Sequence, residues 1–159
     1  METYPDLAML RYMTISHDSA ITHQLMVLTY CGISGTYIDA PYHEDPDGDK
    51  ICDYPLEKLA HLPLIVVNKP DSRVFEREDF DGLEVSGKAA LLNSKHDQFF
   101  GKEEYGINTP YLSVEAADYL VEQGVVLVGI DSPLVDNIET SEAAIPVHNI
   151  LLKQRHCYL

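Results

Sequence analysis

An aspartate and a histidine stand four residues apart in the run Gly35–His43, GTYIDAPYH, with Pro41 between them. In an extended chain Tyr37 and Asp39 share one face, and a turn at Pro41 would bring His43 back toward Asp39. A carboxylate beside an imidazole stabilises the protonated ring, which suits general acid or base chemistry near neutral pH. The same pair could instead ligate a divalent cation, or could be ordinary polar residues of a turn. The residues alone leave these three interpretations open.

The elements that must position this run are those of an α/β fold. Ser113 is a predicted N-cap for a helix over Val114–Gln123, and Gly124 stands just past its end. A continuous apolar run follows at once, as expected for a strand buried on both faces. Short apolar, β-favouring segments predict strands over Leu25–Tyr30, Leu62–Asn68, Lys88–Asn93 and Val125–Ile130.

The remaining segments complete a mixed central β-sheet with packed helices. Pro55–Leu59 favours a short helix, and Ala144–Lys153 favours another whose start is restricted by Pro146. Asp131–Pro133 lies at the carboxyl end of a predicted strand, where open α/β sheets tend to bind ligands. No repeat or low-complexity linker interrupts the chain, so we expect one domain over residues 1–159.

Composition narrows the classes of partner. A formal net charge of −15 argues against binding to nucleic acid or to an anionic membrane surface. The 3 cysteines are widely spaced and form no C-x-x-C pair, which fits a reducing cytoplasm. The longest apolar runs are too short to span a bilayer, and the first residues lack a signal-peptide layout. We therefore expect a cytoplasmic protein that binds neither nucleic acid nor an anionic membrane surface.

The run SGTYIDAPYH resembles the motif H-x-G-T-H-x-D-x-P-x-H of the cyclase-like metal-dependent hydrolases, the family that includes bacterial kynurenine formamidase. The residues that fit in register are Gly35, Thr36, Asp39, Pro41 and His43. Two later segments, Leu127–Asp136 (LVGIDSPLVD) and Ile145–Leu152 (IPVHNILL), also resemble the family. The resemblance implies the family's swivelling β/β/α type of fold, in a chain shortened at both ends.

The resemblance also implies roles for individual residues. Asp39 and His148 would bind a divalent metal, zinc or manganese, and His43 would be the general acid/base. The family's reaction is hydrolysis of an amide-type carbon–nitrogen bond, which for an arylformamidase of the kynurenine pathway is a formamide. Relatives are typically dimers or tetramers, so a homo-oligomer is expected. Lys95–Gln98 is a predicted surface loop from which His96, or the nearby Phe99, could contact a substrate.

The motif is degraded at two positions. Its first and second histidines are replaced here by Ile33, which has no donor atom, and Tyr37, whose phenol is mostly protonated at neutral pH. A catalytic zinc site normally has three protein ligands, so the loss predicts weakened metal binding, or none. The alternative function is therefore a catalytically inactive relative that binds a small molecule or a protein. Cys31, His17 and His23 lie nearby in the sequence and are the candidates for a rebuilt site. In a third reading, the chain is a truncated or split product whose missing ligands come from another segment or subunit.

Overall fold

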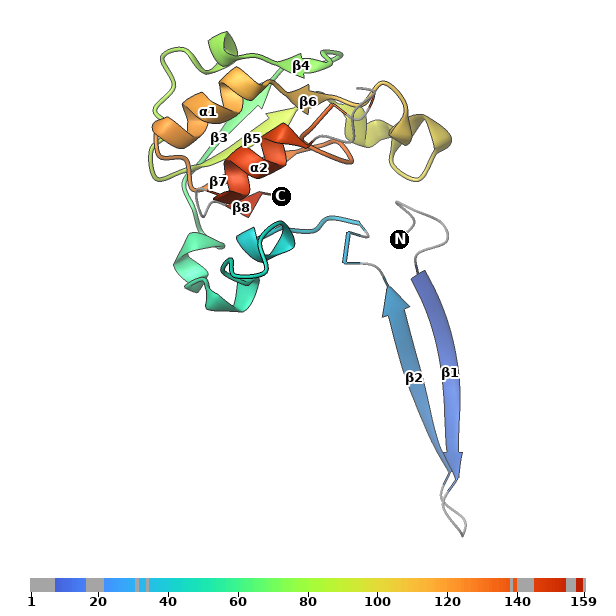
Figure 1. The fold of residues 1–159 in the computed structure, drawn as a ribbon. Helices are drawn as coiled ribbons and strands as arrows, with labels where there is room; N and C mark the ends of the chain where they lie inside the picture. Colours follow the sequence, from blue (N-terminus) through green and yellow to red (C-terminus); the bar gives the residue numbers. More distant parts are fainter. Residues whose placement is uncertain are drawn as a thin grey trace. The chain divides into compact units, whose positions relative to one another are not determined.

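The computed structural model describes residues 8–16, 22–30, 32–33, 35–137, 139, 145–153 and 157–158. The chain divides into two compact units, Met1–Tyr37 and Ile38–Leu159. Whether they form the single domain expected from the sequence stays a prediction. The first unit contains an antiparallel hairpin of β1 (Ala8–Ser16) and β2 (Thr22–Tyr30), drawn in blue in Figure 1. The predicted strand at Leu25–Tyr30 lies within β2, whereas β1 was not predicted.

The second unit is built on a parallel sheet with strand order β3-β5-β7-β8. Its strands are β3 (Leu64–Asn68), β5 (Ala89–Asn93), β7 (Leu127–Ile130) and β8 (Cys157–Tyr158). The strands predicted from apolar runs are thus confirmed within two residues of their ends, and β8 is an addition. A second, two-stranded parallel sheet consists of β4 (Val74–Phe75) and β6 (Tyr111–Leu112). In the sequence, β4 lies between β3 and β5, and β6 lies between β5 and β7.

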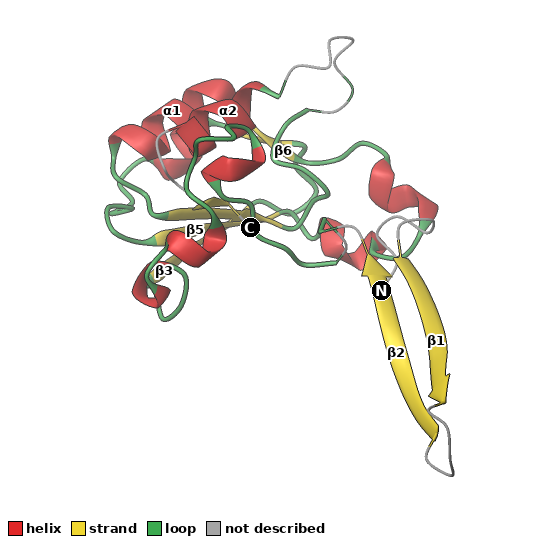
Figure 2. Cartoon of the chain, turned by 60° about the horizontal axis from the view of Figure 1, so that its bottom comes forward, coloured by secondary structure: helices red, strands yellow, loops and turns green. Residues whose placement is uncertain are grey.

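Two α-helices, α1 (Val114–Glu122) and α2 (Pro146–Lys153), cover the same face of the parallel sheet (Figures 1 and 2). Short 3₁₀ helices supply most of the connections: η1 (Pro41–His43), η2 (Ile51–Asp53), η3 (Leu56–Lys58), η4 (Arg77–Phe80), η5 (His96–Phe99) and η6 (Glu103–Gly106). The helix expected near Pro55 is η3. In the part of the chain that the structure describes, no helix is both long and apolar enough to cross a membrane.

The core lies between this sheet face and the two helices. Val67, Leu92 and Val128 belong to the same buried cluster as Leu120 of α1 and Leu151 of α2. Burial of each such side chain contributes about 1.5–3 kcal/mol. The strand β7 lies between β5 and β8, and Leu127, Val128 and Gly129 are buried while Ile130 is half-buried, close to what the continuous apolar run predicted. The packed core fixes the start of α2, and with it the position of His148.

The predicted N-cap of α1 is confirmed, because Ser113 Oγ accepts a hydrogen bond of 3.2 Å from the Ala116 backbone N–H. Ser113→Ala is expected to lower the free energy of unfolding by about 1 kcal/mol, since that donor is then left unpaired. Urea denaturation measures the change, with the exposed Ser86→Ala as the matched control. Equal midpoints for the two variants would contradict the assigned cap.

Candidate metal centre

One tight turn brings His43 back toward Asp39, as the sequence predicted. Pro41 opens η1, and the His43 backbone N–H donates to the Ala40 carbonyl at 2.8 Å. The following polar turn folds back closely, since a Cβ on Gly48 would lie only 2.7 Å from the Pro41 carbonyl carbon. As a result, His43 Nδ1 lies 3.8 Å from Asp39 Oδ1.

The Asp39 carboxylate is buried with one oxygen unsatisfied. The residue is 8% exposed, and Oδ2 has no hydrogen-bond partner among the described residues. The other oxygen is too far from His43 Nδ1 for a hydrogen bond, at 3.8 Å. A buried charged group costs a great deal of free energy unless it is paired or coordinates a metal. The position therefore fits a carboxylate whose partner is a cation.

His148 approaches from the first turn of α2. It is 3% exposed, and its Nδ1 contacts Oδ2 of the buried Asp136. The same carboxylate accepts the His148 backbone N–H at 3.0 Å and the Val147 N–H at 2.8 Å. The ring is thus held in place from one side.

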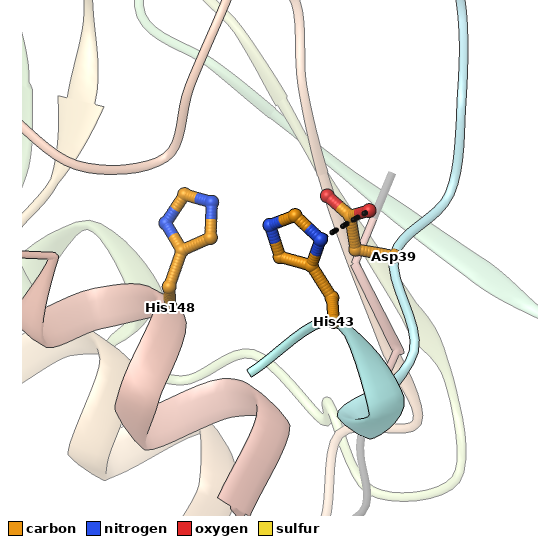
Figure 3. Close-up of side chains that lie close together, drawn as sticks. All are labelled: Asp39, His43 and His148. Carbon is orange, nitrogen blue, oxygen red and sulfur yellow. Dashed lines mark ion pairs between the residues drawn. The ribbon is translucent and has the colours of Figure 1, made fainter. Parts of the chain in front are cut away.

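The three side chains Asp39, His43 and His148 form one group, and Figure 3 shows them pointing toward one another. One potential ligand atom from each lies within 4.8 Å of the other two. The His43 and His148 rings have centroids 6.3 Å apart. Two imidazoles and a carboxylate are a donor set that zinc and related divalent metals accept. Asp39 and His148 are buried while His43 is exposed, so the residues present fit an ion held from the protein side and open toward solvent.

The two degraded motif positions, Ile33 and Tyr37, are half-buried residues of the first unit, whereas Asp39, His43 and His148 belong to the second. Of the nearby candidates for a rebuilt site, Cys31 and His17 lie outside the described residues, and His23 lies in β2. The loss of the ligand role at Ile33 and Tyr37 stays a prediction, as does a rebuilt site that uses Cys31, His17 or His23.

The loop expected at Lys95–Gln98 is not simply a surface loop, and that prediction was wrong for His96. His96 is 7% exposed, its Nε2 hydrogen-bonds the Tyr105 carbonyl at 2.9 Å, and its ring stacks on the Tyr105 ring. These contacts hold η5 against η6. His96 and Phe99 both line a cleft of ≈ 350 Å³, and no member of the Asp39–His43–His148 group lines it. Substrate contact from His96 or Phe99 stays a prediction.

Asp131, which the sequence placed at the end of a strand where ligands tend to bind, hydrogen-bonds instead to Ser94 and His96. Its carboxylate accepts hydrogen bonds from the Ser94 backbone N–H, from the Ser94 hydroxyl at 2.7 Å and from the His96 backbone N–H at 3.1 Å.

The site residue that was not predicted from the sequence is Asp136. One signal was available: α2 begins at Pro146 after Ile145, whose side chain accepts no hydrogen bond, so a polar residue elsewhere in the chain was a candidate for the cap.

Comparison with known proteins shows the family to which the chain is similar. Kynurenine formamidase of Bacillus cereus is 30% identical over 122 residues, which are 76% of this chain and 56% of that protein. Kynurenine formamidase of Bacillus cytotoxicus is 34% identical over 113 residues, 70% of this chain and 52% of that protein. Isatin hydrolase A from Labrenzia aggregata shares the fold, with a TM-score of 0.71 at 19% identity, over 94% of this chain and 68% of that structure.

The chain thus spans about half the length of the curated relatives that it matches. The family model described as "Putative cyclase" matches residues 5–137, which include Asp39, His43 and Asp136. This match covers most of the sequence and agrees with the mixed α/β fold. The chain belongs to the cyclase family.

Proposed function

We propose that this protein is a metal-dependent hydrolase of an amide-type carbon–nitrogen bond in a small molecule, with a formamide as the favoured substrate. The observation that carries the proposal is the buried Asp39 carboxylate, whose unsatisfied Oδ2 lies in a group with His43 and His148. Kynurenine formamidases are relatives at 30–34% identity over most of the chain, which supports the formamide as substrate class.

In this proposal Asp39 and His148 hold the ion, and His43 moves protons. A divalent ion held there supplies a Lewis acid and a nucleophilic water at neutral pH. His43 is accessible to a substrate from solvent, with its side chain 44% exposed, and lies within ion-pairing distance of Asp39. Its imidazole accepts a proton from the attacking water and returns one to the departing nitrogen. The carbon–nitrogen bond breaks as a carbon–oxygen bond forms, giving a carboxylic acid and an amine.

Hydrolysis of a formylated aromatic amine, followed by formate release, tests the proposal. Protein treated with a chelator is expected to be inactive, and addition of zinc or manganese is expected to restore turnover. Absence of both turnover and metal uptake would favour the alternative, a family member that acts as a binding scaffold. A metal-dependent rise in melting temperature provides the independent readout of uptake, because a ligand that binds only the folded state stabilises it.

The same proposal includes the finer expectations from the sequence. The ion is zinc or manganese, the compartment is the cytoplasm, and the protein is a homo-oligomer. The exposed thiol of Cys52 is consistent with a reducing environment. Light scattering of the purified full chain measures the oligomeric state, and a monomer at all concentrations would remove that part of the proposal.

A further inference from the structure

Asp136 is a deeply buried carboxylate at the end of the family-like segment Leu127–Asp136, and the proposed function gives it no role. It is 1% exposed and lies after β7, yet its side-chain hydrogen bonds within the described part of the chain go to the first turn of α2. Pro146, the first residue of that helix, has no backbone N–H to satisfy. The next two backbone donors, from Val147 and His148, both go to Asp136. Asp136 is therefore a cap supplied from outside the helix, 11 residues before Val147.

The contact with the imidazole makes Asp136 more than a cap. An ionised carboxylate can only accept hydrogen bonds, so His148 Nδ1 must carry the proton in this contact. The neutral ring then has its lone pair on Nε2, the nitrogen on the edge that faces His43 and Asp39 in Figure 3. Among the described residues, no lysine or arginine pairs with Asp136. Its charge faces the positive end of the α2 dipole and the imidazole N–H.

We infer that Asp136 is a positioning residue, which holds His148 as the Nδ1–H tautomer and aims Nε2 at the site of the divalent ion. This inference rests on the proposed function, because it assigns His148 as a ligand. Carboxylate partners of this kind fix the orientation of a ligating histidine and raise its basicity, and their loss typically weakens metal binding about 10–100-fold.

The informative variant is Asp136→Asn. The amide oxygen can still accept one backbone N–H of α2, while the NH₂ group is a donor where the carboxylate was an acceptor. An NH₂ group facing Nδ1 favours the Nε2–H tautomer, whose remaining lone pair points away from Asp39 and His43. A role as a helix cap alone does not require any change of tautomer.

Long-range ¹H–¹⁵N spectra of the histidine rings, recorded on the full chain after chelator treatment, measure the tautomer directly. The His148 signal is assigned by its loss in His148→Gln. We expect Nδ1–H in the wild type and a shift toward Nε2–H in Asp136→Asn. An Nε2–H tautomer in the wild type would overturn the inference, and that measurement needs no variant at Asp136 that folds.

Zinc titration against a competing chelator is the second arm. Asp136→Asn is expected to bind zinc about 10–100-fold more weakly than wild type, whereas Ser113→Ala, which removes the cap of α1, is expected to keep wild-type affinity. Equal weakening in both variants would reduce the effect to general destabilisation, and unchanged affinity in Asp136→Asn would refute the positioning role. If the wild type takes up no zinc, the proposed function fails, and the metal-free ring spectra still decide what Asp136 does.

Discussion

Asp39→Asn is expected to abolish the metal-dependent rise in melting temperature and to leave the metal-free protein as stable as wild type, or more stable. The carboxylate is buried, and its Oδ2 has no partner in the part of the chain that is described. In the absence of metal that charge is therefore destabilising, and replacement by a neutral amide removes the penalty. With metal present the same change removes a ligand, and affinity should fall by more than the roughly 10–100-fold typical of losses outside the ligands.

Thermal denaturation with and without zinc measures both effects in one experiment. The matched control is Asp47→Asn, which removes one negative charge from an exposed position of the neighbouring turn. The control should keep the full zinc-dependent stabilisation, about 2.7 kcal/mol when free zinc is 100 times the dissociation constant. If Asp39→Asn is instead less stable than wild type without metal and still responds to zinc, Asp39 has a structural role and is not a ligand.

His43→Ala is expected to lower kcat for a formylated aromatic amine by about 10²–10⁴-fold, the usual contribution of a positioned general acid or base. The side chain is exposed and lies 3.8 Å from Asp39 without belonging to the buried part of the group. Bound metal, measured by elemental analysis, should stay near the wild-type ratio. Added imidazole should restore part of the rate, because the missing function is a proton carrier.

Two other outcomes for His43→Ala would each change the account. Loss of the metal together with the activity would make His43 a third ligand, which its place in the group allows. Equal rates for variant and wild type would remove His43 from any catalytic role. His61→Asn serves as the control, since it deletes another exposed imidazole and asparagine tolerates the positive φ of 57° found there.

The features that could be predicted from the sequence are those whose cause is local. Ser113, the helix that it caps and the apolar strand behind it follow from neighbouring residues, and the structure has them nearly at the predicted positions. The approach of His43 to Asp39 was likewise predictable, because Pro41 sets the turn between them.

The features that could not be predicted depend on contacts between distant segments. Asp136 lies 12 residues before His148, and only the packing of α2 on the sheet brings the two together. His96 was expected at the surface, and its burial depends on the stacking with Tyr105 in a neighbouring 3₁₀ helix. The strand β1 carries Arg11, Thr14 and Ser16 among its apolar residues, and pairing with β2 selects its conformation.

Anomalous diffraction at the zinc edge, from crystals of the full chain grown with zinc, tests most directly whether Asp39 and His148 hold a divalent ion. We expect one strong peak about 2 Å from an Asp39 carboxylate oxygen and from His148 Nε2. Crystals with no peak there, or with zinc bound only elsewhere on this acidic chain, would contradict the role of Asp39 and His148 as metal ligands.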